Sequence, residues 1–309
     1  MNQTPTEQFV PAVSIVIPTY NHAEFLHEAL QSVVNQTFQN WEAIIVNNFS
    51  SDGTLQIIEQ FDEPRFKVIN YHNHGVIAAS RNLGIQNSLA PVIAFLDSDD
   101  IWHEEKLSKC MPEFKNDVDV VCHGENWISD DLVNRLIFYG PAKNATHRNL
   151  LFRGNCISTS ATLVKKYVLE QLGGFSENPS FITAEDYELW IRISVVTAKF
   201  VFVREILGDF RRHENSASNS INKHLEAEIA VINHHVKLMR QSPITILRAR
   251  HRRAKATYNA GRTHMRGGRN GSALSLFAQA LIQSPIFLRT YVAITLTFIN
   301  LFRLKSIQR

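Results

Sequence analysis

Short apolar runs of strand length alternate with helix-periodic segments over the first hundred residues. The strand-like runs cover residues 13–18, 41–46, 66–71 and 91–96. The segments between them, residues 24–34, 54–61 and 76–88, space their apolar residues as amphipathic helices do. Parallel strands need long crossovers, which are usually helices, so this alternation predicts an α/β fold whose sheet is flanked by helices.

Polar residues come directly after each predicted strand. In sheets of this kind, ligands lie beyond the carboxyl ends of the strands. The four polar strand ends are residues 19–21, 47–48, 72–75 and 97–100. We therefore expect the binding site of this chain at that edge of the sheet.

The most strongly charged strand end contains Asp97, Asp99 and Asp100. Three carboxylates at one strand end repel one another unless a positive charge lies among them. Magnesium or manganese, which prefer hard oxygen ligands, would relieve the repulsion together with diphosphate oxygens. Aspartate is also common in surface loops and at helix N-caps, so the pattern alone leaves both interpretations open.

Composition suits one large core and a smaller second region. The chain has 309 residues, of which 44% are hydrophobic. Its three cysteines, Cys110, Cys122 and Cys156, have no metal-binding spacing and no even pairing, which favours a reducing compartment. Residues 1–11 have neither a basic start nor an apolar run, unlike a secretory signal. We therefore expect a cytoplasmic protein, at the cytoplasmic face of the inner membrane if it binds lipid.

Positive charge is concentrated at the end of the chain. Residues 220–309 contain 15 Lys and Arg but only two acidic residues, and from residue 221 the pattern is almost entirely helical, with Pro243 and Pro285 as expected breaks. A basic tail can bind nucleic acid, anionic lipid or an acidic protein. Because the cluster at residues 248–255 has no aromatic side chains around it for base stacking, we expect no nucleic-acid partner.

Residues 291–302 form an uncharged segment within this basic region. Twelve residues are too few to span a bilayer, which needs about 20 apolar residues. An amphipathic helix lying on an anionic membrane surface fits the composition. A helix packed against the rest of the protein, or against another subunit, fits it nearly as well.

Five short motifs occur in a characteristic order. They are SIVIPTYN at residues 14–21, SVVNQT at 32–37, SDGT at 51–54, RNLG at 81–84 and FLDSDD at 95–100. Together they resemble the ordered motifs of family 2 glycosyltransferases with the GT-A fold, over residues 12–215. The resemblance implies a Rossmann-like mixed sheet flanked by helices, with an α-helical C-terminal extension.

The resemblance also implies a division of the chain. A GT-A catalytic domain would cover residues 1–219, with a nucleotide-binding half at about 12–100 and an acceptor half at 101–219. A helical, basic region would follow at residues 220–309.

Several donor-binding residues are implied by the resemblance. The loop Pro18-Thr19-Tyr20 would lie against the uridine, and Arg81 would lie near the diphosphate. A surface position on a helix is the alternative for Arg81. The Asp-X-Asp element would be Asp97-Ser98-Asp99, with Asp97 toward the ribose and Asp99 on Mn²⁺ or Mg²⁺.

One position departs from the family pattern. The second strand usually ends in Asp-Asp or Asp-Asn, whereas this chain has Asn47-Asn48. An amide can still pair with uracil, because it offers both an acceptor and donors. Asn48 is therefore the candidate base-binding residue, and UDP is the expected nucleotide.

Two later segments complete the implied active site. Asp186, in the element TAEDYELW, would be the catalytic base, and Glu185 would bind sugar hydroxyls; acidic residues are also common at helix starts for dipole reasons. In residues 210–218, His213 would be a metal ligand and Arg211 would neutralise phosphate. The Gln-x-x-Arg-Trp element of processive synthases is missing, which favours single-sugar addition.

The sequence thus predicts an inverting, non-processive hexosyl- or N-acetylhexosaminyltransferase. It would use a nucleotide sugar, expected to be UDP-linked, to build a surface glycan or lipid-linked oligosaccharide. A nucleotidyltransferase is one alternative, although its usual glycine-rich basic loop is missing after the first strand. A noncatalytic scaffold with a degenerate nucleotide site is the other.

Overall fold

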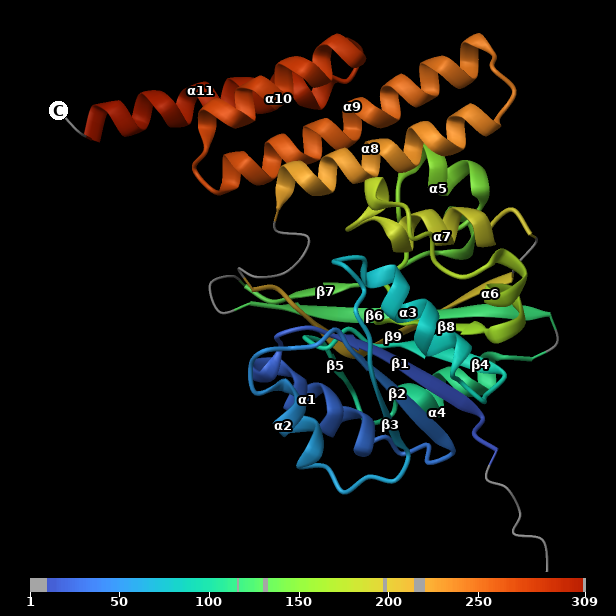
Figure 1. The fold of residues 1–309 in the computed structure, drawn as a ribbon. Helices are drawn as coiled ribbons and strands as arrows, with labels where there is room; N and C mark the ends of the chain where they lie inside the picture. Colours follow the sequence, from blue (N-terminus) through green and yellow to red (C-terminus); the bar gives the residue numbers. More distant parts are fainter. Residues whose placement is uncertain (1–9, 116, 130–132, 197–198, 214–219, 308–309) are drawn as a thin grey trace, which may run out of the picture. The chain divides into compact units, whose positions relative to one another are not determined.

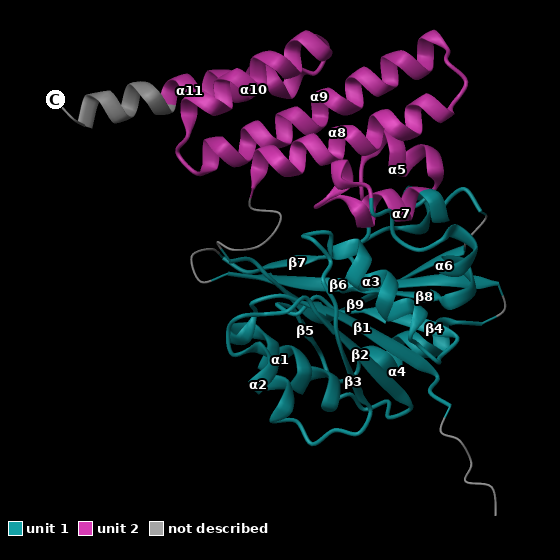
Figure 2. Ribbon diagram, in the orientation of Figure 1, with its two compact units in different colours: residues 1–145, 156–177, 192–213 teal, residues 146–155, 178–191, 214–309 magenta. Residues whose placement is uncertain are grey.

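The protein divides into two compact units, shown separately coloured in Figure 2. The computed structural model describes residues 10–307 except 116, 130–132, 197–198 and 214–219, with side chains described up to residue 299. Unit 1 comprises residues 1–145, 156–177 and 192–213, and unit 2 comprises residues 146–155, 178–191 and 214–309. Figure 1 names the helices and strands of both units.

Unit 1 is built on one mixed sheet. Its path of strands is β3-β2-β1-β4-β8-β6-β9-β5, and β7 pairs with β6. The first four strands in the chain pair in parallel, whereas β8 is antiparallel to both β4 and β6. The strands are β1 (Val13–Thr19), β2 (Trp41–Asn47), β3 (Phe66–Asn70), β4 (Val92–Phe95), β5 (Ile101–Trp102), β6 (Val118–Ile128), β7 (Arg135–Ile137), β8 (Thr162–Lys165) and β9 (Lys199–Arg211).

Helices cover this sheet and pack against its hydrophobic core. They are α1 (Ala23–Val34), α2 (Thr54–Glu59), α3 (Ile77–Gln86), α4 (Lys106–Cys110) and α6 (Lys166–Leu172), with short 3₁₀ turns at Met111–Glu113 and Ala142–Asn144. Every residue of β1, β2 and β4 is buried, as expected for strands covered on both faces. The expected α/β class and the strands and helices predicted in the first hundred residues are confirmed.

Two strands of unit 1 continue well beyond their mainly apolar parts. These parts lie at residues 118–122 and 200–203, but β6 continues to Ile128 and β9 to Arg211. Their second halves contain polar residues such as Glu125 and Asp209, and the register between them shifts near Gly124. Because a bulge breaks the alternation of inward and outward side chains, periodicity alone misses these halves.

Unit 2 is helical. It contains α5 (His147–Arg153), a 3₁₀ turn at Pro179–Phe181, residues 185–191 of α7 (Glu185–Ile193), α8 (Ile221–Leu238), α9 (Pro243–Arg266), α10 (Asn270–Gln283) and α11 (Leu288–Ile307). The predicted helical breaks are confirmed: Pro243 is the first residue of α9, and Pro285 lies between α10 and α11. The start of α7 belongs to the same compact unit as the C-terminal helices. The predicted functional division at residue 220 stays a prediction.

The core of the α9–α10 pair is made of small and aromatic residues. Tyr258 and Phe277 have ring centroids 5.7 Å apart, and they pack with buried alanines of α9, α10 and α11. Residues 254–283 therefore lie in a packed pair of helices. Within the part of the chain that is described, no helix is both long and apolar enough to cross a membrane.

A single glycine allows α3 to lie close to β1. A Cβ atom added at Gly84 would lie 2.4 Å from Cγ1 of Val16, which is fully buried in the sheet. Valine has little rotamer freedom with which to move aside. The glycine of the RNLG motif is therefore required by the close approach of helix and strand.

We predict that Gly84→Ala destabilises the protein by about 1–3 kcal/mol, since over-packing a core forces backbone shifts. Gly271→Ala is the matched control, because a Cβ atom there would meet nothing within 4 Å. We expect that control to be neutral or slightly stabilising. Urea unfolding of both variants measures the difference, and equal stability of the two would contradict the packing argument.

Candidate active site

The acidic loop after β4 is a tight turn rather than a helix start. The backbone N–H of Asp100 donates to the carbonyl of Asp97 at 3.0 Å, and the N–H of Asp97 donates to the Ser160 hydroxyl at 3.1 Å. The nearest following helix, α4, begins at Lys106 and is preceded by Glu105. The carboxylates therefore do not cap a helix, and their positions come from the loop itself.

Asp97 is paired with a buried arginine. Nη2 of Arg81 lies 2.6 Å from Oδ1 of Asp97, and Arg81 is only 3% exposed. Its guanidinium also lies 5.3 Å from the ring centre of Phe175. A buried arginine requires a carboxylate partner. The alternative of a surface arginine is wrong: Arg81 is a buried residue of α3 whose guanidinium contacts Asp97 after the end of β4.

Asp99 lies beside His213, 114 positions later in the chain. Oδ2 of Asp99 and Nε2 of His213 are 3.0 Å apart, and both side chains are mostly buried. Adjacent ligands of an octahedral cation with bonds of about 2.1 Å lie about 3 Å apart, so this pair fits two neighbouring positions around Mg²⁺ or Mn²⁺. Among the described residues, no group of three or more His, Cys, Asp or Glu side chains forms a metal site.

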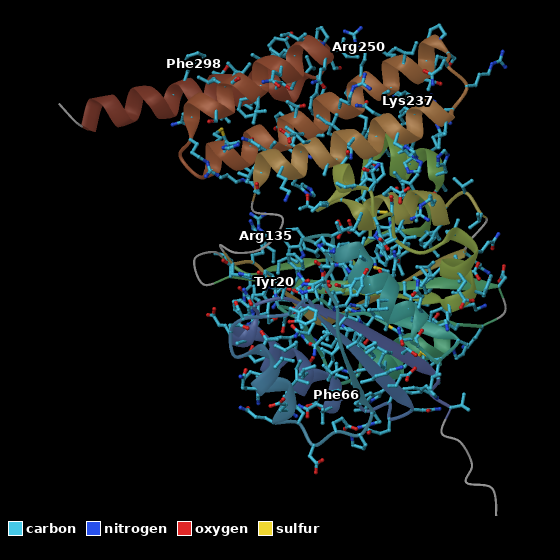
Figure 3. All side chains as sticks on the ribbon, viewed as in Figure 1. Tyr20, Phe66, Arg135, Lys237, Arg250 and Phe298 are labelled. Carbon is cyan, nitrogen blue, oxygen red and sulfur yellow. The ribbon has the colours of Figure 1, made fainter. Side chains whose placement is uncertain are left out.

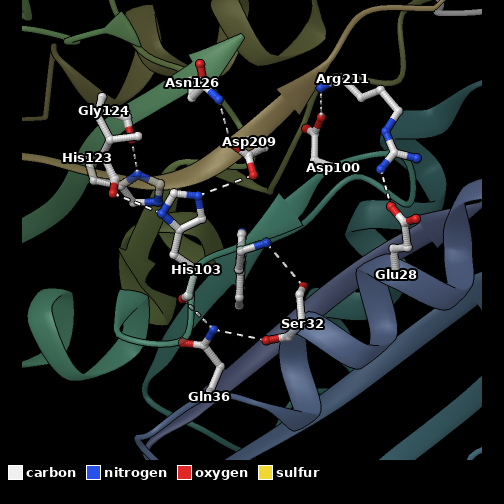
Figure 4. A network of polar contacts seen from close by, with 12 residues as sticks. Glu28, Ser32, Gln36, Asp100, His103, His123, Gly124, Asn126, Asp209 and Arg211 are labelled. Atoms are coloured by element: carbon white, nitrogen blue, oxygen red, sulfur yellow. Dashed lines mark hydrogen bonds and ion pairs between the residues drawn. The ribbon is translucent and has the colours of Figure 1, made fainter. Parts of the chain in front are cut away.

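Helix α1 supports the segment that carries His213. The ring of Phe25 lies 4.4 Å from that of His213, and the Arg211 guanidinium lies 4.9 Å from the Phe25 ring centre. Arg211 also forms an ion pair with Glu28, and its backbone N–H donates to Asp100 at 2.9 Å (Figure 4). The side chain expected on phosphate is thus held by a carboxylate of α1.

Polar contacts hold the end of β9 in place. Asp209 accepts from Asn126 of β6 at 3.0 Å and lies 3.3 Å from His103, which follows β5 (Figure 4). The hydrogen bond to Asp209 raises the pKa of His103, and burial only partly opposes this shift. Asp209 therefore joins β9 to both neighbouring strands and fixes the path toward Arg211.

A buried ionisable cluster lies beneath the acidic loop. Asp100 accepts from the Ser160 hydroxyl at 2.5 Å, and the Lys106 ammonium donates to the Ser160 carbonyl at 2.6 Å. Burial, followed by the charges of Asp99, Glu125 and Asp97, raises the pKa of Asp100 well above its ordinary value. Burial likewise lowers the pKa of Lys106 to about 7 and raises that of Glu125 to about 7. The loop therefore lies next to a buried region in which charged side chains are destabilised by the loss of solvation.

Sequence reasoning missed the supporting residues of this site. His22, whose Nδ1 lies 2.7 Å from the Ser98 hydroxyl, and Phe25 and Glu28 all belong to or adjoin α1. Their spacing of three residues is the only signal that they share a side of the helix. Lys106 and Glu125 carried no signal, because charged residues are almost never predicted to be buried.

The ends of β1 and β2 lie side by side. Thr19 pairs with Asn47 in the parallel register, and the N–H of Asn48 donates to the Thr19 carbonyl at 2.9 Å. Tyr20, labelled in Figure 3, is 54% exposed. The Thr19 hydroxyl is buried with no hydrogen-bond partner within the described part of the chain. Pro18, Thr19, Tyr20 and Asn48 are therefore brought together at one strand edge.

The two asparagines at the end of β2 have different surroundings. Asn47 is buried, donates to Asn70 at 2.7 Å and accepts from Ser50, so its amide serves the loop structure. Within the described residues, the side chain of Asn48 forms one hydrogen bond, accepting the Asn73 N–H at 3.0 Å. Its oxygen retains a second lone pair and its NH₂ group two donors. Of the two, Asn48 is the better suited to contact a base.

Glu185 and Asp186 form the first turn of α7, in unit 2. Oδ1 of Asp186 accepts the N–H of Tyr187 at 2.6 Å, and Oε2 of Glu185 accepts the N–H of Thr183 at 2.8 Å. The acidic loop belongs to unit 1, and the roles of Asp186 and Glu185 stay predictions. In the expected closing segment at residues 210–218, residues 214–218 lie outside the described residues.

Comparison with known sequences finds a matching family. The profile described as "Glycosyl transferase family 2" matches residues 14–173. One relative is the UDP-Glc:alpha-D-GlcNAc-diphosphoundecaprenol beta-1,3-glucosyltransferase WfgD of Escherichia coli. It is 30% identical over 228 residues, which cover 71% of this chain and 85% of WfgD.

Solved structures share the fold. Residues 1–349 of TarS from S. aureus, in complex with UDP-GlcNAc, superimpose with a TM-score of 0.64 at 18% identity, covering 88% of this chain and 81% of that one. The mannosyltransferase PcManGT of Pyrobaculum calidifontis, in complex with GDP-Man and Mn2+, gives a TM-score of 0.61 at 15% identity, with 95% and 83% covered. These similarities bear on the fold alone.

Proposed function

Because the chain belongs to glycosyltransferase family 2 and is a glycosyltransferase of glycan synthesis, we propose that it transfers one hexosyl or N-acetylhexosaminyl group from a UDP-linked donor, with inversion. The observation that carries the proposal is the pairing of Asp99 with His213 and of Asp97 with Arg81 at the end of β4. WfgD, which is 30% identical, is named for a UDP-Glc donor, and this supports a uridine nucleotide.

The donor nucleotide would bind along the ends of β1, β2 and β4. The exposed ring of Tyr20 offers a stacking face, and the unpartnered Thr19 hydroxyl and the Asn48 amide offer polar contacts to a base. Asp97 and Ser98 would contact the ribose. Arg81 keeps a positive charge at the strand end where the diphosphate would lie, and Arg211 would leave Glu28 to bind phosphate.

Asp99 and His213 would hold Mn²⁺ or Mg²⁺. That cation would offset the negative charge that develops on the departing nucleoside diphosphate. The packing of the His213 ring against Phe25, with ring centres 4.4 Å apart, supports a fixed ligand at this position.

Asp186 would act as the general base in this scheme. Its carboxylate would accept the proton of the acceptor hydroxyl as that oxygen attacks the anomeric carbon on the face opposite the leaving group. Glu185 would bind sugar hydroxyls. The acceptor would be a glycan or a lipid-linked oligosaccharide; the name of WfgD gives alpha-D-GlcNAc-diphosphoundecaprenol, a lipid-linked sugar, for that relative.

We predict that Asp186→Asn lowers kcat by about 10²–10⁴-fold, because the amide cannot accept a proton. UDP affinity should change less than twofold. Glu226→Gln, at an exposed position of α8, is the matched control and should keep full activity. Nucleotide release from a panel of nucleotide sugars provides the assay. Undiminished turnover in Asp186→Asn would show that Asp186 is not the general base. No turnover of any donor by the wild type would favour a noncatalytic scaffold.

We predict that Asp99→Ala abolishes the manganese-dependent part of UDP binding, since one of two protein ligands is lost. Titration calorimetry of UDP with and without Mn²⁺ measures this part directly. Asp62→Ala, an exposed carboxylate of the same unit, serves as control and should bind as the wild type does. Equal Mn²⁺ dependence in the two variants would contradict the metal role.

Helix α11 supports a further part of the proposal, binding to an anionic membrane surface. It exposes Tyr291, Val292, Leu296, Phe298 and Ile299, each at least 43% exposed, while Ala293 and Thr297 are buried (Phe298 is labelled in Figure 3). The basic residues of the C-terminal region would attract anionic headgroups. The helix would then insert its exposed apolar side chains at the membrane interface.

We predict that the protein cosediments with phosphatidylglycerol vesicles and not with phosphatidylcholine vesicles or DNA, and that NaCl weakens the binding. Phe298→Glu should weaken it by about tenfold, because it adds a negative charge and removes an apolar ring. Val195→Glu, an exposed apolar position in unit 1, is the charge-matched control. Equal binding by both variants would instead favour a helix that packs on protein.

A further inference from the structure

The backbone just before the candidate base is strained. Thr183 has a φ of +81°, a left-handed conformation that is unfavourable for a β-branched residue. Such strain persists only where surrounding contacts over-determine the conformation, and it concentrates at functional sites. Thr183 lies three residues before Asp186, at the entrance to α7.

Helix α8 holds Thr183 from one side. Nδ1 of His224 lies 2.9 Å from the Thr183 carbonyl oxygen and 3.3 Å from its hydroxyl. A carbonyl oxygen only accepts hydrogen bonds, so Nδ1 must carry the proton. On the other side of the residue, the Thr183 N–H donates to Glu185 at 2.8 Å. Both polar backbone groups of the strained residue are therefore tied down.

The rest of the α7 entrance is also bound by the C-terminal helices. His235 of α8 lies 3.2 Å from Glu188, and both side chains are buried. Phe181 packs edge-on against His234, with ring centres 5.5 Å apart. Arg252 of α9 is buried with its guanidinium 5.7 Å from the ring centre of Tyr187. These contacts explain why residues 178–191 and the C-terminal helices form one compact unit.

We propose that His224 is a positioning residue, which holds Thr183 in its strained conformation and so directs Asp186. The inference rests on the proposed function only in taking Asp186 as the base. It gives the C-terminal helices a role in the reaction that is separate from membrane binding. Because a misplacement of about 1 Å can cost about 100-fold in rate, loss of this contact should affect kcat more than donor affinity.

A double-mutant cycle tests the proposal, because glycine adopts a φ of +81° without strain. We expect His224→Ala to lower kcat by about 10–100-fold, with the donor KM within about twofold of wild type. In a Thr183→Gly background, adding His224→Ala should lower kcat by less than about threefold relative to Thr183→Gly alone. Glycine at position 183 is not strained, so the contact with His224 is no longer required to hold the backbone. The assay is Mn²⁺-dependent UDP release from UDP-glucose or UDP-GlcNAc. An equal loss in both backgrounds overturns the proposal.

Two further variants distinguish loss of the His224–Thr183 hydrogen bond from a nonspecific loss of structure. His224→Asn keeps an N–H donor for the Thr183 carbonyl and should recover most of the activity. Lys223→Ala, at the exposed neighbouring position, should behave as wild type. Failure of the asparagine to recover any activity counts against the hydrogen bond as the cause.

Amide hydrogen exchange tests whether His224 holds the segment around Thr183, and it does so independently of turnover. In His224→Ala, peptides covering residues 181–189 should exchange at least about tenfold faster, while α9 and α10 are unchanged. Unchanged exchange at residues 181–189, or faster exchange throughout the unit, overturns the proposal. If the wild type turns over no nucleotide sugar, the proposed function fails, and the exchange result still shows whether His224 holds the segment.

Discussion

The acidic end of β4 is the constraint on which unit 1 depends. Asp97, Asp99 and Asp100 follow a strand that is buried on both faces, so their charges must be balanced locally. Arg81 balances Asp97, His213 lies beside Asp99, and hydrogen bonds from Ser160 and Arg211 satisfy Asp100. The partners come from α3, the β8 region and the end of β9. The ion pairs and hydrogen bonds of these carboxylates thus bring together segments that are distant in the chain.

Residues of α1, β9 and the buried region next to the loop support this arrangement. Phe25 and Glu28 of α1 hold the residues after β9, and Asp209 holds the strand itself. Lys106 and Glu125 lie beneath the loop, where burial shifts the pKa of each to about 7. A group that reacts must be held by groups that do not. Arg81, Lys106 and Glu125 are buried, whereas Asp97 and Asp99 are only partly buried.

The second unit shows the same principle in a helical setting. The first turn of α7 carries three acidic residues, Glu185, Asp186 and Glu188. Thr183, two residues before the helix, has an unfavourable φ, and its polar backbone groups contact His224 and Glu185. The C-terminal helices therefore contribute to the structure of the segment that carries the proposed base.

Local patterns in the sequence were enough to predict β1 to β4, the helices between them and the polar strand ends, because periodicity and apolar run length act over a few residues. The ordered motifs likewise indicated the family and selected Asp97, Asp99 and His213. Only the tertiary structure decided that Arg81 is buried against Asp97, that Phe25 holds His213, and that His224 meets Thr183. These contacts join residues from 16 to 188 positions apart, and no local pattern records which distant side chains the folded chain brings together.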